Sequence, residues 1–254
     1  MLLALDVRVR HEVVSVDRST GWSPWPTSRS GELEQLAYDA LVLSPGATDS
    51  PADPGGRARM TLRDLADLDR LVAAASKAST AVVVGGGFVG LEVAENLAAT
   101  GTAVTVVELA PQVLAPLDQD MVGPVHDELR LHGVGLALGR SVTEVRERTV
   151  LLDDGSELPA ELVVFAIGVR PEIELATLAG LEIGPHRGIV VDDDLRTSVE
   201  GIYAVGDATE KRCRVLGEPT LIPLANLANR QGRRVADVIV GRPGASPPRT
   251  APRS

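Results

Sequence analysis

Residues 81–108 read AVVVGGGFVGLEVAENLAATGTAVTVVE and contain the pattern that decides the fold. Four apolar residues, 81–84, predict a short buried strand that leads directly into the glycine-rich turn 85–90, a G-x-G-x-x-G. A helical apolar pattern follows and stops at Gly101, and a second β-branched strand ends in an acid, Glu108. This order of strand, turn, helix, strand and acid predicts a βαβ unit that binds a dinucleotide.

The three fingerprint glycines are expected to have separate tasks. Gly85 permits a tight turn because it has no Cβ, Gly87 lets a pyrophosphate approach backbone N–H groups at a helix start, and Gly90 lets that helix pack closely on the sheet. Glu108 would accept hydrogen bonds from the adenosine ribose and repel a 2′-phosphate, and residues 109–110 offer no Arg for one. NADH is therefore expected to be preferred over NADPH. The alternative is a glycine-rich turn that binds no ligand.

Length and composition restrict the class of protein. The chain has 254 residues, enough for one large or two small domains, and 44% of them are hydrophobic, so substantial cores are expected. The net charge of −10 argues against binding to nucleic acid or to an anionic membrane surface. Residues 1–6 lack the basic region of a signal peptide, no apolar run is long enough to span a bilayer, and the single Cys213 excludes an internal disulfide. A cytoplasmic location is therefore expected.

Outside the fingerprint the chain alternates between predicted strands and helices. Residues 2–16 are expected to be β-structure, residues 19–31 a loop, and residues 38–44 a buried strand. A helix capped by Thr61 is expected to run to about Lys77. Beyond Glu108 the patterns predict helices at 118–132 and 223–240 and strands at 134–138, 142–145, 149–152 and 162–167.

The order of the short motifs is more specific than the fingerprint alone. S-P-G-A ends the strand at 44–47, A-I-G-V-R-P lies at 166–171, G-I-Y-A-V-G-D at 201–207 and I-P-L-A-N-L-A-N-R-Q-G-R at 222–233. With the fingerprint they resemble the pyridine nucleotide–disulfide oxidoreductases, in particular the subgroup of coenzyme A disulfide reductases, NADH oxidases and NADH peroxidases. The resemblance extends over about residues 7–241.

The resemblance implies an α/β fold of two parts. A Rossmann-like NAD(P)-binding domain at 79–190 would be inserted into a partial FAD-binding domain formed by 1–78 and 191–241, with a disordered tail at 242–254. Hydride would pass from the nicotinamide to the flavin and onward to a disulfide or to oxygen. The implied class is an FAD- and NAD(P)H-dependent oxidoreductase.

On the NAD side, the family's contacts fall on named positions of this chain. Phe88 matches an aromatic residue that lies over the flavin, although burial in a core is the alternative. Glu92 matches an acid near the nicotinamide, although it could only complement the helix dipole. Gly168 matches a backbone contact to NAD, and Gly86 and Val89 belong to the same cofactor-binding turn.

On the FAD side, three further segments match. Gly46 and Ala47 match a turn near the nucleotide part of FAD. Gly206 and Asp207 match the second FAD motif, where the carboxylate accepts a hydrogen bond from a ribitol hydroxyl; a plain turn-forming acid is the alternative. Leu224 and Ala225 match backbone contacts to the pyrimidine edge of the flavin. No catalytic residue and no metal ligand is assigned.

The chain departs from the family in two features. Family members begin with another G-x-G-x-x-G and a cysteine motif, and neither is in this sequence. The chain is therefore expected to start within the FAD domain, to lack the C-terminal dimerisation domain, and to hold flavin weakly unless a second copy or a partner chain supplies the missing half.

Three functions are compatible with these features. The first is the incomplete oxidoreductase, and the second is a non-catalytic NAD(H)-binding remnant or partner-dependent module. The third, a dehydrogenase that uses only the Gly85 site, needs a proton-shuttling pair. His126 and His132 do not supply one, because both are expected at the surface of a helix remote from the fingerprint.

Overall fold

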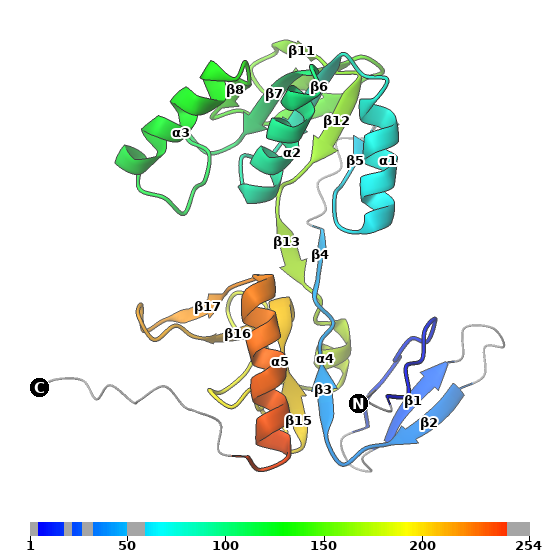
Figure 1. Ribbon diagram of the computed structural model, residues 1–254. Helices are drawn as coiled ribbons and strands as arrows, with labels where there is room; N and C mark the ends of the chain where they lie inside the picture. The colour runs from blue at the N-terminus through cyan, green and yellow to red at the C-terminus, as the bar shows by residue number, and fades with distance from the viewer. Residues whose placement is uncertain (1–4, 18–21, 27–32, 50–58, 243–254) are drawn as a thin grey trace, which may run out of the picture. The chain divides into compact units, whose positions relative to one another are not determined.

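The computed structural model describes residues 5–17, 22–26, 33–49 and 59–242. The chain divides into two compact units, which are labelled by element in Figure 1. The central unit holds residues 49–169, and the flanking unit holds residues 1–48 and 170–254. Two short strands, β4 (Ala47–Asp49) and β13 (Val169–Pro171), pair where the chain passes between the units.

The central unit is built on a five-stranded sheet whose strands are all parallel and lie in the order β5-β12-β6-β7-β8. Both faces of β6 and β12 are buried, which explains their continuous apolar sequences. The strands span β5 Arg59–Met60, β6 Thr80–Val84, β7 Ala103–Glu108, β8 Gly135–Leu138 and β12 Leu162–Phe165.

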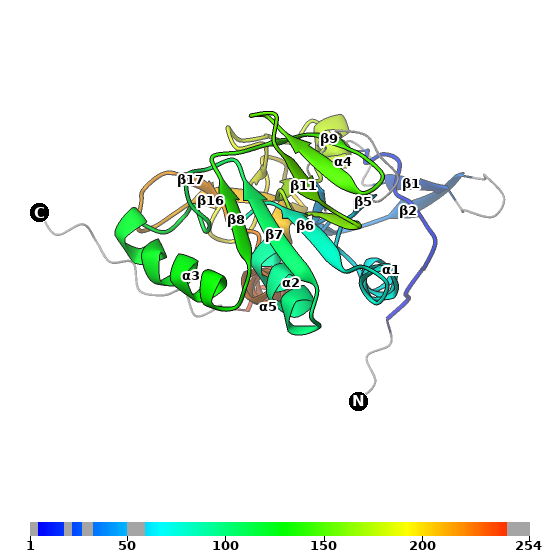
Figure 2. The same ribbon diagram turned by 90° about the horizontal axis from the view of Figure 1, so that it is seen from above.

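Helices cover one face of this sheet and a small antiparallel sheet covers the other, as Figure 2 shows. On the helical face, Leu71 and Val93 pack with Val83 in one core cluster. On the opposite face, Val150 packs with Val82 in a second. The helices are α1 Leu65–Ala75, α2 Phe88–Ala99 and α3 Gln119–Leu131, and the covering sheet consists of β9 Val142–Val145, β10 Thr149–Leu152 and β11 Glu157–Pro159. The Rossmann-like α/β prediction is confirmed.

The flanking unit has a separate core, in which Leu43, Ile202 and Val235 are buried together. Strands β3 (Leu41–Leu43) and β15 (Ile202–Ala204) form a parallel pair, and a short 3-10 helix, η1 (Gly206–Ala208), follows β15. The remaining elements are β1 Trp22–Pro26, β2 Leu33–Ala37, α4 Glu174–Leu178, β14 Ile189–Val190, β16 Thr209–Arg212, β17 Pro219–Leu221 and α5 Ala225–Ile239.

The observed units differ from the expected domain limits at both ends of the 79–190 segment. Residues 59–78 belong to the central unit because Leu71 packs into the core around β6. Residues 170–190 belong to the flanking unit because Ala176 and Ile189 pack into its core.

Three local expectations were wrong. Residues 22–26, expected in a loop, form a strand, because their backbone pairs antiparallel with β2 from Trp22–Ala37 to Pro26–Leu33. Residues 2–16 were expected as β-structure, and their described part, 5–16, contains an isolated bridge residue at His11 but forms no strand. The cap of α1 is Asp64, not Thr61, since its carboxylate accepts the N–H of Asp67 at 2.8 Å.

Other expectations fall on residues that the structure does not describe. These are residues 2–4 of the expected β-structure, residues 19–21 and 27–31 of the expected loop and residues 243–254 of the expected tail. Within the described ranges, no helix combines the length and the apolar character that a membrane crossing requires.

The core of the central unit predicts the effect of a truncation in β6. Val83 is fully buried, so Val83→Ala should lower the free energy of unfolding of this unit by about 2 kcal/mol through lost apolar contact and a residual cavity. Val72→Ala is the matched control, because Val72 is 60% exposed on α1 and should cost less than about 0.5 kcal/mol. Urea unfolding, together with hydrogen exchange in β6, measures the free energy of unfolding of each variant. An equal loss in Val83→Ala and Val72→Ala would contradict the described core.

Candidate functional site

The glycine turn between β6 and α2 is closely packed, both internally and against the segment that follows β12. Gly85 has φ +109°, and a Cβ there would lie 2.4 Å from the carbonyl oxygen of Ala166. A Cβ on Gly90 would lie 1.9 Å from the carbonyl oxygen of Gly85. A Cβ on Gly87, by contrast, would meet no atom of the described residues within 4 Å. Gly85 and Gly90 are therefore required by the turn itself, whereas Gly87 leaves open space beside the helix start.

The start of α2 is arranged to receive an anion. Gly87 is its N-cap and has no side chain to bond the first N–H groups, and no acidic residue lies in the first turn. Leu91 is the first residue whose N–H is paired within the helix, with the oxygen of Gly87 at 3.0 Å. The preceding N–H groups and the helix dipole thus suit a phosphate.

The side chains on the first turns of α2 face outward. Phe88 is 69% exposed, so the alternative that it is a core residue is wrong. Val89 is 50% exposed, and Glu92 is exposed as well. Glu92 lines a groove of about 700 Å³ between α1 and α2, together with Leu68 and Asn96.

Glu108 is held against the glycine turn by two backbone groups. Its Oε2 accepts the N–H of Gly86 at 2.6 Å, and its Oε1 accepts the N–H of Ala110 at 2.7 Å. A Cβ on Gly86 would lie 3.2 Å from the Cβ of Glu108 and 2.9 Å from Val113, so only glycine lets the two approach. Each carboxylate oxygen keeps acceptor capacity for a ribose hydroxyl.

The loop after Glu108 completes this site, and sequence reasoning missed it. The N–H of Leu114 donates to the oxygen of Gly86 at 2.8 Å, and Leu114 adopts φ +50°, a conformation that a Leu rarely takes. Val113 is fully buried, and its N–H donates to Nε2 of His126 at 3.3 Å. His126, expected to be remote from the fingerprint, therefore supports the loop that contacts the glycine turn. No residue type in the loop signals this role.

Gly168 lies at the same edge of the sheet as the glycine turn. Strand β12 runs parallel to β6, and the N–H of Ala166 donates to the oxygen of Val84 at 2.8 Å. Gly168 follows with φ +95° at the carboxyl ends of these strands. This edge is where open α/β sheets bind their ligands.

A second glycine-containing edge lies in the flanking unit. The N–H of Val205 donates to the oxygen of Leu43 at 2.9 Å, which extends the parallel pairing of β15 and β3 to their carboxyl ends. Gly46 (φ +75°) follows β3, with Ala47 buried after it, and Gly206 (φ +81°) follows β15. The turns at Gly46 and Gly206, which the family resemblance assigns to FAD, therefore start from neighbouring strand ends.

Asp207 and the start of α5 lie at this second edge. Asp207 is half-buried, and no group of the described residues forms a hydrogen bond or ion pair with its carboxylate. Leu224 is the N-cap of α5 and offers no side-chain bond to the first N–H groups, which begin at Ala225. A Cβ on Gly206 would lie 3.9 Å from the Cβ of Ala228, so the first turn of α5 adjoins the turn of Asp207. A carboxylate acceptor and free N–H donors are thus brought together.

The sequence contains a single thiol, that of Cys213. Cys213 is half-exposed at the end of the β16–β17 hairpin. Hydrogen bonds from the backbone of Leu216 and then Val215 lower the pKa of the Cys213 thiol. The 254 residues contain one cysteine, so the chain itself cannot form the cysteine pair of a redox-active disulfide.

The fold and the two edges define a class of protein with two nucleotide sites. One is a Rossmann-type fingerprint with its acid on the next strand, and the other is a glycine–acid turn beside an uncapped helix. The sequence matches the pyridine nucleotide-disulphide oxidoreductase family over residues 3–232, and the chain belongs to this family.

Known relatives agree with this assignment. The chain is 35% identical over 227 residues to rubredoxin-NAD(+) reductase of Pseudomonas putida, covering 85% of this chain and 58% of the relative. It is 27% identical over 239 residues to coenzyme A disulfide reductase of Staphylococcus haemolyticus, covering 93% and 54%. The crystal structure of the reduced CoADR-RHD protein of Bacillus anthracis superposes with a TM-score of 0.90 at 40% identity, covering 95% of this chain and 45% of that one. The chain thus spans a little over half the length of these two curated relatives.

The two glycines that bracket the helix start give a matched pair of variants. Gly90→Ala should weaken NADH binding about 10- to 100-fold and lower stability, because its methyl group meets the carbonyl of Gly85. Gly87→Ala should leave the unfolding midpoint of the unliganded protein unchanged and still weaken NADH binding, since its methyl group fills the open space at the helix start.

Gly123→Ala in α3 is the control, because a Cβ there meets no described atom within 4 Å. Calorimetric titration with NADH, together with thermal unfolding, separates the three variants. Wild-type affinity in Gly87→Ala would show that no pyrophosphate lies at this helix start.

Proposed function

We propose that this chain is the nucleotide-binding part of a flavin-dependent NADH oxidoreductase. The observation that carries the proposal is the anchored Glu108 carboxylate facing the uncapped start of α2, with acceptor capacity left for a ribose. A bound FAD would supply the hydride-accepting centre, and this chain's residues would bind and orient the two nucleotides. The N–H groups at the starts of α2 and α5 would hold anionic or carbonyl oxygens, and Glu108 and Asp207 would hold sugar hydroxyls.

The proposed preference for NADH over NADPH rests on charge. A 2′-phosphate would approach the Glu108 carboxylate, which two backbone N–H groups hold in place so that it cannot turn away. The next residue, Leu109, is 72% exposed and carries no charge that could compensate. One relative carries the name rubredoxin-NAD(+) reductase, which supports a preference for the unphosphorylated cofactor.

The residues of the flanking unit fit the ribitol and flavin parts of FAD. Asp207 offers a carboxylate that no described residue pairs with, Ala225 begins a helix without a capping side chain, and Gly46 and Gly206 allow close approach of backbone. We assign Phe88 and Glu92 to the nicotinamide side, because both are exposed on the first turns of α2. Gly168 would add a backbone contact to NADH.

The electron acceptor is proposed by class. Two relatives are named for a coenzyme A disulfide and for rubredoxin, and one similar solved structure is that of a water-forming NADH oxidase, so a disulfide, a small redox protein or oxygen is the proposed acceptor. A second copy or a partner chain would complete the flavin site, and the cytoplasm is the proposed location because it keeps the single thiol reduced.

A second candidate function is a non-catalytic NAD(H)-binding module. It is favoured by the difference between the two units. The NADH edge lies on a five-stranded sheet, whereas the FAD edge lies on the two-stranded pair of β3 and β15 among the described residues. Such a protein would bind NADH and transfer no electrons.

An absorption spectrum separates the two functions. Wild-type protein mixed with FAD should retain it through gel filtration, and anaerobic addition of NADH should bleach the visible flavin band. Asp207→Asn should weaken FAD binding about tenfold through the loss of a charge-assisted hydrogen bond. The same variant should bind NADH like wild type, because the Gly85 site lies in the other unit. NADH binding without any flavin uptake would refute the oxidoreductase and support the module.

The charge argument predicts a change in cofactor preference. Wild type should bind NADH at least about tenfold more tightly than NADPH, and Leu109→Arg should tighten NADPH binding about five- to tenfold by pairing with its phosphate. Leu131→Arg is the control, because Leu131 is 78% exposed on α3. The substitution adds the same charge as Leu109→Arg at a different place on the surface. Titration of both cofactors into each variant measures the ratio, and equal affinities in wild type would contradict the role of Glu108.

A further inference from the structure

Gln231 is a buried polar side chain that the function described above does not use. It lies in α5 and is 5% exposed, and Thr209, also 5% exposed, lies beside it at the start of β16. Buried amides are retained where their hydrogen bonds are satisfied, so the partners of Gln231 show what it holds.

Those partners form a closed ring around Gly206. The N–H of Gly206 donates to Oε1 of Gln231 at 2.6 Å. Nε2 of Gln231 donates to Oγ1 of Thr209 at 3.4 Å, and that hydroxyl donates to the oxygen of Gly206 at 2.8 Å. Both backbone polar groups of Gly206 are therefore fixed by buried side chains, in a residue whose φ of +81° only glycine adopts freely.

The ring determines where Asp207 points. No group of the described residues bonds the Asp207 carboxylate, so its direction depends on the backbone of η1 that carries it. The same Gln231 lies on α5, whose first N–H groups begin at Ala225. One side chain thus sets the distance between the acid and the helix start, the two groups proposed to contact one FAD.

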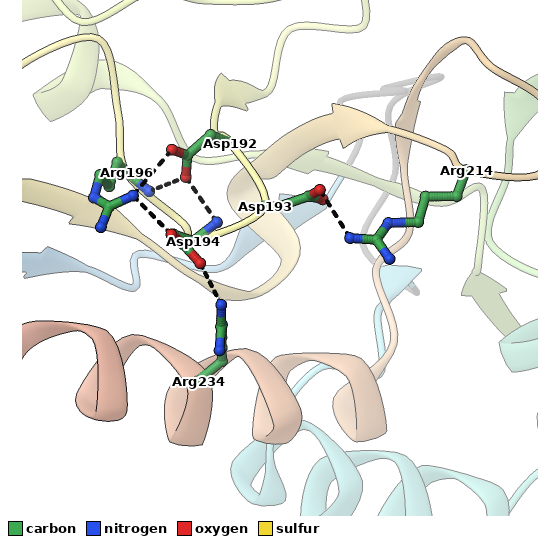
Figure 3. A network of polar contacts seen from close by, with 6 residues as sticks. All are labelled: Asp192, Asp193, Asp194, Arg196, Arg214 and Arg234. Carbon is green, nitrogen blue, oxygen red and sulfur yellow. Dashed lines mark hydrogen bonds and ion pairs between the residues drawn. The ribbon is translucent and has the colours of Figure 1, made fainter. Parts of the chain in front are cut away.

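A second tie holds α5 farther along the helix. Arg234, one turn after Gln231, donates to the carboxylate of Asp194, which also pairs with Arg196 at 2.7 Å (Figure 3). The guanidinium of Arg234, and then that of Arg196, hold the pKa of Asp194 below its ordinary value. The helix therefore has one attachment to the Asp207 turn and another to the 192–196 turn.

We infer that Gln231 is a positioning residue for the flavin: it locks the turn of Asp207 to α5 so that the carboxylate and the helix start address the same FAD. This inference rests on the proposed function. Gln231 does not touch the cofactor; it acts through Gly206.

The test compares Gln231→Met with Arg234→Met. Gln231→Met keeps the approximate length and volume of the side chain but removes the hydrogen-bond partner of the part-buried Gly206 N–H. It should weaken FAD binding about tenfold or more and change the visible circular dichroism of bound flavin, which reports its orientation. Arg234→Met removes the tie to Asp194 and should lower the unfolding midpoint while FAD affinity and the flavin spectrum stay as in wild type.

NADH affinity, measured in the same samples, should be unchanged in both variants, because that site lies in the other unit. Thr209→Val provides a second variant if Gln231→Met does not fold. Thr209→Val removes the two hydrogen bonds of the ring that involve the Thr209 hydroxyl. The affinity for FAD should fall, but by a smaller factor than in Gln231→Met.

The outcomes distinguish the inference from the function on which it rests. If wild type takes up no FAD, the proposed function fails and the inference fails with it. If wild type binds FAD and both Gln231→Met and Thr209→Val bind it equally well, only the inference is overturned. The same holds if Arg234→Met weakens FAD binding as much as Gln231→Met, because Gln231 would then act only through general stability.

Discussion

The carboxylate of Glu108, bound by the backbone N–H groups of Gly86 and Ala110, is the interaction on which the site depends. It joins the ends of β6 and β7 and fixes the glycine turn against the strand that follows it. A carboxylate that accepts two N–H bonds is strongly oriented, and hydrogen bonds to a charged acceptor are stronger than neutral ones. The bonds also explain why residue 86 is glycine, since a side chain there would collide with Glu108 and Val113.

The two units use the same physical device at their helix starts. Gly87 before α2 and Leu224 before α5 provide no capping side chain, so the first N–H groups of each helix have no internal partner. Such groups are normally satisfied by caps, water or ligands, and an acid stands nearby in each unit: Glu108 in one and Asp207 in the other. A ligand that satisfies them binds only the folded chain and therefore stabilises it.

The sequence was sufficient to predict the parts of the site that depend on local backbone rules. The glycines at 85, 87 and 90 and the acid at 108 follow from the strand–turn–helix pattern, and parallel strands place their carboxyl ends at one edge. The second edge, with Gly46 and Asp207, was predicted through family resemblance. The α/β fold itself follows from the alternating apolar strands and helices.

What could not be predicted depends on contacts between distant segments. Leu114 at positive φ, His126 behind its loop and Gln231 behind Gly206 are ordinary residues whose roles arise only when three segments meet. The place of α1 in the central core depends on a distant contact in the same way, because it is made through Leu71, and helical periodicity cannot assign that contact. Strand β1 shows that local loop chemistry can be overridden by pairing with a neighbour.

The most direct test of the account is a crystal structure of the chain with NADH bound. We expect the adenosine ribose hydroxyls within hydrogen-bonding distance of the Glu108 carboxylate, with the pyrophosphate at the N–H groups that begin α2. In the same structure Glu108 should keep its bonds to Gly86 and Ala110. A bound NADH whose ribose lies away from Glu108, or a Glu108 that leaves the glycine turn to admit it, would contradict the account.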